Sequence, residues 1–211
     1  MKPLLGKGNT EGRKFVVETH FAKRARALTL TNAERQLVVG SLLGDATLMS
    51  TTAGFSFRVH HGIRQTAYVD WKFKILERFV RTSPRVSGNG YYFRTVSHPE
   101  FSQLRERFYP AGQKIVPLSL LEAQLDSFGL AVWIMDDGAL ERKQLRLNTQ
   151  SFSSKENEGL VRLLRAKFGL EVSLNIDKTR HRLRFNAATI ATLLSLIRPH
   201  FIPSMLYKLP L

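Results

Sequence analysis

The sequence predicts a mixed α+β fold made of two structural copies, each with the element order αββαββα. Two observations lead to this prediction. Short motifs recur along the chain at separations of 88 to 94 residues, and helix-like and strand-like runs follow one another in the same order in both copies. Similarity at a fixed separation is typical of chains that fold as repeated units. We therefore expect two halves, residues 31–117 and 118–211, after a basic N-terminal extension over residues 1–30.

The repeated motifs lie at matching places in the two copies. An Asp closes a short apolar run at Asp45 and again at Asp137, 92 residues later (137 − 45). Three longer patterns recur in the same order: Arg58-Val59-His60 as Arg146-Leu147-Asn148, Tyr92-Phe93-Arg94 as Arg182-Leu183-Arg184, and Phe108-x-Pro110-x-x-x-Lys114-x-x-Pro117 as Phe201-x-Pro203-x-x-x-x-Lys208-x-Pro210. Four coincidences in one order indicate a duplication.

The elements of the first copy follow from capping and periodicity. A helix begins at Thr31, where Thr31 and Glu34 form a capping-box pattern, and it runs to Asp45. Two strands follow, and the clearer one, residues 55–60, alternates apolar and polar side chains. The remaining elements are an amphipathic helix over 68–80, strands over 85–87 and 91–96 around a turn at 88–90, and a helix over 99–108.

The second copy repeats this order. A helix ends at Asp137, and a strand over 143–150 precedes a helix over 155–168. Two strands then flank the loop 177–180, and a final helix completes the copy; these elements cover 172–176, 183–186 and 187–198. Alternation places four apolar side chains of the strands inward, those of Leu145, Leu147, Leu183 and Phe185.

The charge of the chain indicates a polyanionic partner. There are 32 Lys and Arg residues against 17 Asp and Glu, which gives a formal net charge of +15. A protein this basic most often binds nucleic acid, although a ribosome-associated or merely solvated protein remains an alternative. The hydrophobic content of 43% is enough for a packed core.

The composition also excludes some classes of protein. Cysteine is absent, which excludes disulfides and thiolate zinc sites. The longest apolar stretch, residues 128–135, is too short to span a bilayer, and the first seven residues have no apolar segment typical of an export signal. We expect an intracellular protein, in the cytoplasm, the nucleoid or an organelle matrix, that makes no contact with a membrane.

Polar side chains on the outward faces of the predicted strands form a candidate nucleic-acid surface. Arg, Asn and Gln can bind base edges in a major groove, which also admits a β-ribbon. The candidates are Ser56, Arg58, His60 and Arg94 in the first copy, and Gln144, Arg146, Asn148, Gln150, Arg182, Arg184 and Asn186 in the second. Each of them alone would also suit an ordinary solvated sheet. As a set, they favour nucleic acid because these faces are basic and nearly free of Asp and Glu.

The two repeated acids are the candidate catalytic residues. A carboxylate at the C-terminal end of a helix lies where the helix dipole is already negative. Two such ends brought together would repel each other unless a divalent cation lay between them. Metals held by paired carboxylates commonly act on phosphates, so Asp45 and Asp137 together predict a metal site for phosphate chemistry.

The two apolar runs, Val38–Ala46 and Leu130–Gly138, resemble the LAGLIDADG motif of homing endonucleases in its single-chain, two-motif form. The stretches Leu147–Phe152, Met135–Gly138 and Pro203–Pro210 are also similar to the branch that contains the yeast mitochondrial omega-intron endonuclease. The resemblance covers residues 31–211. Two motifs at the repeat spacing, with matching tails, make it specific.

The resemblance implies a fold and a metal site. The motif helices pack side by side as the interface between the halves, and two antiparallel sheets form a saddle for DNA. Asp45 and Asp137 bind divalent metal over the scissile phosphates, and the backbone carbonyls of Gly44 and Asp136 also contact it. The cofactor is Mg²⁺, and Mn²⁺ or Ca²⁺ can replace it in binding. The second motif departs from the pattern, with Val132 and Asp136 where the first has glycines.

Lys114 and Lys208 match the basic residues that accompany each active site in this branch. A lysine beside a phosphate can orient the attacking water or stabilise the negative pentacoordinate state. The pair His60-His61 suggests a zinc or HNH-type site, but no cysteine or second histidine cluster supplies further ligands. We therefore expect those histidines to face DNA or to be structural.

The sequence thus predicts a monomeric, site-specific endonuclease for double-stranded DNA. Two alternatives remain open. One is a maturase that binds intron RNA on the same fold, and the other is a DNA-binding regulator without catalysis. Retention of both acids and both lysines argues against the regulator.

Overall fold

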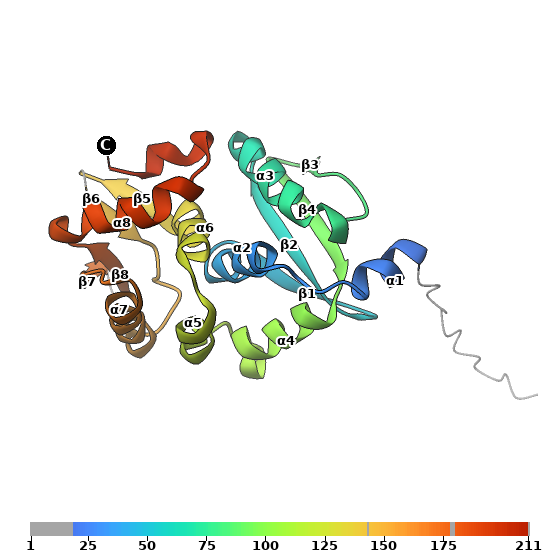
Figure 1. Ribbon diagram of the computed structural model, residues 1–211, viewed down its shortest axis with the longest axis horizontal. Helices are drawn as coiled ribbons and strands as arrows, with labels where there is room; N and C mark the ends of the chain where they lie inside the picture. Colours follow the sequence, from blue (N-terminus) through green and yellow to red (C-terminus); the bar gives the residue numbers. More distant parts are fainter. Residues whose placement is uncertain (1–18, 143, 178–179, 211) are drawn as a thin grey trace, which may run out of the picture.

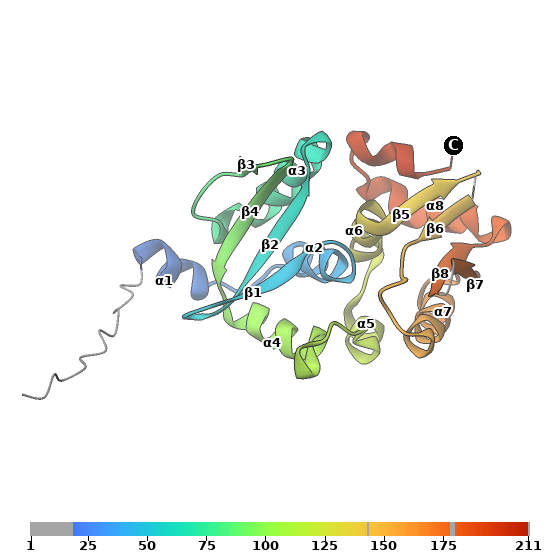
Figure 2. The ribbon, with the colours of Figure 1, turned by 180° about the vertical axis from the view of Figure 1, so that it is seen from behind.

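The predicted αββαββα duplication is confirmed in a computed structural model, which describes residues 19–142, 144–177 and 180–210. Two four-stranded antiparallel sheets lie on opposite sides of a central pair of helices, α2 and α6 (Figures 1 and 2). Among the described residues, every helix is too short or too polar to cross a bilayer. The central helix pair is the feature that positions the site.

The first half follows the predicted order closely. Its sheet has the strand order β1-β2-β4-β3, and helices α3 and α4 pack against it. The elements are α2 (Asn32–Leu43), β1 (Thr47–Thr51), β2 (Gly54–Gly62), α3 (Thr66–Leu76), β3 (Arg85–Ser87), β4 (Gly90–Ser97) and α4 (Pro99–Phe108).

The second half repeats this arrangement after a connecting helix, α5 (Leu118–Gln124), that the sequence analysis did not predict. Its sheet has the order β5-β6-β8-β7, equivalent to that of the first half. The elements are α6 (Ser127–Asp137), β5 (Gly138–Glu141), β6 (Gln144–Leu147), α7 (Ser154–Phe168), β7 (Val172–Asp177), β8 (Arg180–Phe185) and α8 (Ile190–Ile197).

Strand register confirms that the two sheets are equivalent. Arg58 on β2 lies opposite Arg94 on β4, and Arg146 on β6 lies opposite Arg184 on β8. The inward residues predicted for the second half are buried, with Leu145, Leu147 and Leu183 fully covered and Phe185 2% exposed. Each sheet therefore packs one apolar face on its helices and presents arginines on the other.

Helices α2 and α6 meet closely because glycine occupies the contact. A Cβ atom on Gly40 would overlap the backbone oxygen of Gly129 and approach the Val132 side chain, and one on Gly44 would overlap Asp136. The glycines of the first motif thus face the residues that replace glycine in the second. The predicted side-by-side packing is confirmed, and the departures of the second motif are accommodated by the first.

Side chains at the other end of the helix pair fix its alignment. The Gln36 amide donates a hydrogen bond to the Gln124 carbonyl and accepts one from the Asp126 backbone N–H. The capping box predicted at Thr31 and Glu34 is present, so α2 begins one residue after its predicted cap. Both helices are then fixed at their beginnings and in contact near their ends.

Two predictions about elements were inaccurate, and one helix was not predicted. The strand expected over 143–150 is only Gln144–Leu147, so Asn148 and Gln150 lie beyond its end. Part of the basic extension forms a helix, α1 (His20–Arg26), which buries Ala25 and lies beside β4. The helix expected over 187–198 is α-helical only over Ile190–Ile197, because Ala187–Thr189 and Arg198–His200 are 3₁₀ helix.

Some predictions fall outside the described residues. They concern residues 1–18 of the extension and the absence of an export signal there, Lys143, and Lys178 and Thr179 in the predicted loop.

Candidate active site

The C-terminal ends of α2 and α6 bring the two predicted acids to one place. Asp45 follows the cap residue Gly44 of α2, and Asp137 is the last residue of α6. Gly44 packs against Asp136, so the two chain segments touch immediately before the acids. The side chain of Asp45 is 51% exposed, so one carboxylate at this meeting point is open to solvent.

The two predicted lysines bind the carbonyl groups at these helix ends. Lys114 Nζ donates to the Gly44 oxygen at 2.8 Å, and Lys208 Nζ donates to the oxygens of Met135 and Asp136, both at 2.6 Å. A positive charge at a helix C-terminus is stabilised by the helix dipole. The lysines therefore occupy equivalent positions in the two halves, as their spacing predicted.

Burial and mutual repulsion hold protons on the acids more tightly than usual. Burial first, and then the negative charges of Asp45 and Asp136, raise the pKa of Asp137 from 3.8 to about 7. Burial and the charge of Asp136 also raise the pKa of Asp45. Burial lowers the pKa values of Lys114 and Lys208, against the opposing effect of the nearby aspartates. These groups share one electrostatic site.

The donor set fits a hard divalent cation. Carboxylate and backbone carbonyl oxygens are the ligands that Mg²⁺ and Ca²⁺ prefer. The carbonyl oxygens of Gly44 and Asp136 each already bind a cation, the ammonium group of a lysine. Burial first, and then repulsion from neighbouring aspartates, raises the pKa values of the two acids beside these oxygens. A metal ion would relieve that repulsion.

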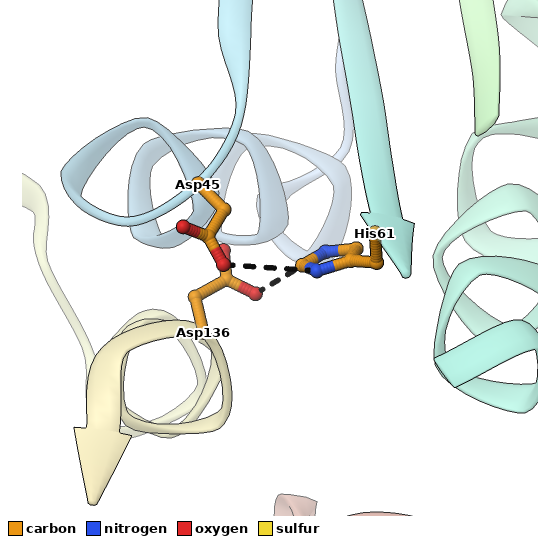
Figure 3. Close-up of side chains that lie close together, drawn as sticks. All are labelled: Asp45, His61 and Asp136. Carbon is orange, nitrogen blue, oxygen red and sulfur yellow. Dashed lines mark ion pairs between the residues drawn. The ribbon is translucent and has the colours of Figure 1, made fainter. Parts of the chain in front are cut away.

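Buried beneath Asp45 lies a polar group made of His61, Lys72 and the Asp136 carboxylate, of which Figure 3 shows His61 and Asp136. Lys72 on α3 donates to Asp136 Oδ1 at 2.7 Å, and both side chains are 0% exposed. His61 on β2 lies 3.7 Å from Asp45 Oδ2 and 3.7 Å from Asp136 Oδ1. Burial and Lys72 lower the pKa of His61 to about 4, so its imidazole is neutral at neutral pH. The side chain of Asp136 thus belongs to this buried group, whereas its carbonyl binds Lys208.

The strand face of the first half carries three of its four predicted residues. His60 and Arg94 are exposed, and Arg58 is half-buried with its guanidinium 5.0 Å from the Tyr92 ring. The prediction for Ser56 is wrong, because Ser56 is only 1% exposed. The β2–β4 register shifts between Ser56 and Arg58, so simple alternation cannot assign both residues to one face.

The strand face of the second half is less free of acid than predicted. Glu141 accepts hydrogen bonds from Arg146 and from both terminal nitrogens of Arg182, the latter at 2.7 and 2.9 Å. Of the remaining candidates, Gln144 is exposed and Gln150 is half-buried. Arg184 Nε donates to Ser173 Oγ, which in turn donates to Asn186 Oδ1. The backbone N–H of Asn148 donates to the Asp137 carbonyl. Glu141 therefore sets the orientation of two predicted DNA-binding arginines.

The sequence pattern of the LAGLIDADG DNA endonuclease family matches residues 35–193, about three quarters of the chain. The chain belongs to this family. The matched segment includes both helix ends, both sheets and the buried group beneath Asp45.

Curated relatives of this LAGLIDADG chain include proteins of several kinds. A probable intron-encoded DNA endonuclease from Mycosarcoma maydis is 36% identical over 126 residues, covering 57% of this chain and 93% of that one. A cytochrome b mRNA maturase from Debaryomyces hansenii is 27% identical over 198 residues, covering 82% and 72%. Protein RecA of Mycolicibacterium flavescens is 34% identical over 200 residues, covering 85% and 47%, so the chain spans about half the length of that relative.

Among solved structures, this LAGLIDADG chain is similar to the homing endonuclease I-WcaI bound to its DNA recognition sequence. The TM-score is 0.82 at 24% sequence identity, and the match covers 97% of this chain and 95% of that one. The likeness shows that the whole fold is shared.

The buried positions of His61 and Lys72 beside Asp136 were not predicted from the sequence. His61 was considered only together with its neighbour, yet adjacent strand residues face opposite ways, and His60 is exposed while His61 is 6% exposed. Lys72 lies four residues from both Tyr68 and Leu76, which are buried on α3. A lysine on an apolar helix face was therefore a signal for a buried ion pair.

Proposed function

We propose that this chain is a monomeric, site-specific endonuclease that cuts both strands of a long DNA target with the help of a divalent cation. The main support is the meeting of α2 and α6, which brings Asp45 and Asp137 together, each beside a lysine that binds the neighbouring carbonyl. The proposal keeps residues 31–117 and 118–211 as the two halves, each supplying one acid and one lysine.

Asp45, Asp137 and the carbonyl oxygens of Gly44 and Asp136 would hold the metal. Mg²⁺ is the proposed ion, and Mn²⁺ or Ca²⁺ would bind to the same oxygen donors. When bound, a divalent cation supplies Lewis acidity, lowers the pKa of water and neutralises a leaving oxygen. Removing the metal with a chelator should therefore stop cleavage.

Lys114 and Lys208 act on the phosphate. Both ammonium groups lie at the helix ends, on the carbonyls next to the acids. An ammonium group beside a scissile phosphate stabilises the extra negative charge of the pentacoordinate state, and its N–H groups can orient water. The two lysines occupy equivalent positions in the two halves. This arrangement suits action by each half on one of the two antiparallel DNA strands.

The two arginine-bearing sheet faces would bind the DNA on either side of the cut. Arg58 and Arg94 lie opposite each other in the first sheet, as Arg146 and Arg184 do in the second. Arg side chains bind phosphates and guanine edges, and the net charge of +15 favours DNA at low salt. His60 and Gln144 add exposed polar groups, whereas Ser56 is excluded by its burial. The protein would act inside the cell, where its DNA target lies.

One second function has specific support. The Debaryomyces hansenii relative is named a maturase for cytochrome b mRNA, and it matches 82% of this chain. Binding of intron RNA could therefore accompany or replace DNA cleavage on the same fold.

Selection from a duplex library separates the two functions. The protein would be incubated with randomised duplex DNA and Mg²⁺, and the new ends would be sequenced. We expect one long motif to be recovered among the cut ends, and none when a chelator replaces Mg²⁺. Intact DNA together with tight binding of an intron RNA would contradict the nuclease and support the maturase.

A further inference from the structure

A buried polar group joins the two halves beneath the exposed acid. Its members are Asp136 on α6, Lys72 on α3 and His61 on β2. The group reaches Asp45 through His61, and Figure 3 shows Asp45, His61 and Asp136 side by side. Lys72 and Asp136 are 0% exposed at their side chains and His61 is 3% exposed. The proposed cleavage mechanism uses Asp45 and the carbonyl of Asp136, but it gives no role to His61, Lys72 or the Asp136 carboxylate.

The group is not a further metal site. Asp45, His61 and Asp136 offer ligand atoms within 4.8 Å of one another, as a metal site would. The Lys72 ammonium, however, lies 2.7 Å from Asp136 Oδ1 and 3.5 Å from His61 Nε2. Lys72 thus already supplies the positive charge, and a metal would have to displace a fully buried ammonium group.

Lys72 also decides which nitrogen of His61 carries the proton. An ammonium group has three donors and no acceptor, so the nitrogen facing it must accept. Nε2 of His61 lies 3.5 Å from Lys72 Nζ and 3.7 Å from Asp136 Oδ1. Because that oxygen already accepts a hydrogen bond from Lys72 at 2.7 Å, we assign the ring proton of the neutral imidazole to Nδ1. Nδ1 is the nitrogen that faces Asp45 Oδ2, at 3.7 Å. This distance is long for a hydrogen bond, but bonds of catalytic groups often shorten only when substrate is bound.

The second half has no equivalent of this arrangement. Arg58 and Arg146 occupy equivalent register positions, so His61, three residues after Arg58, corresponds to Thr149. Thr149 is buried and donates its hydroxyl to Asn157 on α7. The buried residues of α7, over its whole described length, are all uncharged: Asn157, Gly159, Leu160, Leu163 and Leu164. Asp137 therefore has no counterpart of the His61–Lys72 support.

We propose that His61 is a positioning residue that donates its Nδ1–H to the Asp45 carboxylate. Lys72 and Asp136 fix the tautomer and orientation of its ring. This support makes the two strand-cleaving centres unequal. The difference between the centres rests on the proposed nuclease function. The tautomer of His61 does not, because Lys72 and Asp136 set it in the protein alone.

The tautomer can be measured without DNA or metal. Long-range ¹H–¹⁵N spectra distinguish a neutral histidine protonated at Nδ1 from one protonated at Nε2. We expect Nδ1–H for His61 in the unmodified protein and loss of that preference in Lys72→Met. The control Lys74→Met changes an exposed lysine on the same helix and should leave the spectrum unchanged. Nε2–H in the unmodified protein would overturn the proposal, whatever the outcome of any cleavage assay.

Strand-specific rates test the consequence for cleavage. The selected duplex would be labelled on each strand in turn, and single-turnover rate constants would be compared for His61→Ala, His61→Asn and His61→Gln. We expect Ala to change the ratio of the two rate constants about tenfold or more, because a small misplacement of a catalytic group is costly. Asn, which can place an N–H near the position of Nδ1, should restore the ratio, and Gln, which places it near Nε2, should not.

The ratio separates positioning from a general structural effect. Partial unfolding lowers the amount of active protein for both strands equally, so it leaves the ratio unchanged. An unchanged ratio in His61→Ala would contradict the unequal centres. If the unmodified protein cuts no duplex at all, the nuclease proposal fails, while the spectra of the protein alone still decide the tautomer of His61.

Discussion

At the scale of single residues, the site is defined by acids that burial makes difficult to ionise. Asp137 has its pKa raised to about 7, first by burial and then by Asp45 and Asp136. The folded protein without metal therefore keeps a proton that the unfolded chain loses near pH 4. A bound cation would relieve the part of this shift that comes from repulsion between the aspartates.

The raised pKa predicts how stability depends on pH. Because the folded-state pKa lies above the ordinary 3.8, the stabilising contribution of protonated Asp137 is complete below about pH 4 and is lost as pH rises to about 7. The free energy of unfolding of the metal-free protein should therefore fall between pH 5 and pH 8. Because the side chain in Asp137→Asn cannot ionise, the fall should be smaller in this variant, by on the order of 1–3 kcal/mol. Urea unfolding at both pH values measures this. Equal pH dependence in the two proteins would show that Asp137 ionises freely, and Asp70→Asn, at an exposed acid, is the control.

The two acids and two lysines could be predicted from sequence because each recurs at the repeat spacing. The buried group could not, because it has no counterpart in the second half: His61 matches Thr149, and Lys72 lies on a helix whose equivalent buries no charge. Ser56 was misassigned for a local reason, the register shift beside Arg58. Repeated motifs predict the features that the two halves share, but not the features in which they differ.

At the scale of elements, the contact between α2 and α6 positions the whole site. The helices approach closely because Gly40 and Gly44 face Val132 and Asp136. The start of α2 was predictable because a capping box marks it at Thr31. The connecting helix α5 and the early end of β6 were not, because neither has a cap or a turn motif that marks it in the sequence.

Adding one methyl group at the helix contact should separate the helices. Gly40→Ala places a Cβ against the Gly129 backbone oxygen, which cannot rotate away, so we expect a loss of about 1–3 kcal/mol in the free energy of unfolding. Gly62→Ala is the matched control, since a Cβ there meets no atom within 4 Å. Thermal and urea unfolding of both variants measure the difference. If Gly40→Ala proves no less stable than Gly62→Ala, the glycine contact does not set the approach of the helices.

At the scale of the whole molecule, two similar halves present two basic sheets to one partner and two acids to one place. The shared fold was predictable because the αββαββα order and its register repeat. The balance of charge on the second sheet was not, because Glu141 reaches Arg146 and Arg182 from the neighbouring strand β5. The proposed function thus assigns binding and cleavage to separate parts, with DNA binding on the sheets and cleavage at the helix ends.

That separation is tested most directly by comparing Asp137→Asn with the unmodified protein on the selected duplex. Affinity would be measured in Ca²⁺ and single-turnover cleavage in Mg²⁺. We expect the variant to bind the duplex with an affinity close to that of the unmodified protein, because the sheets are unchanged. We also expect it to cut neither strand detectably, because in the proposed site Asp45 and Asp137 hold the metal together. Full cleavage by Asp137→Asn would contradict the central claim that the acids at the ends of α2 and α6 carry out the chemistry.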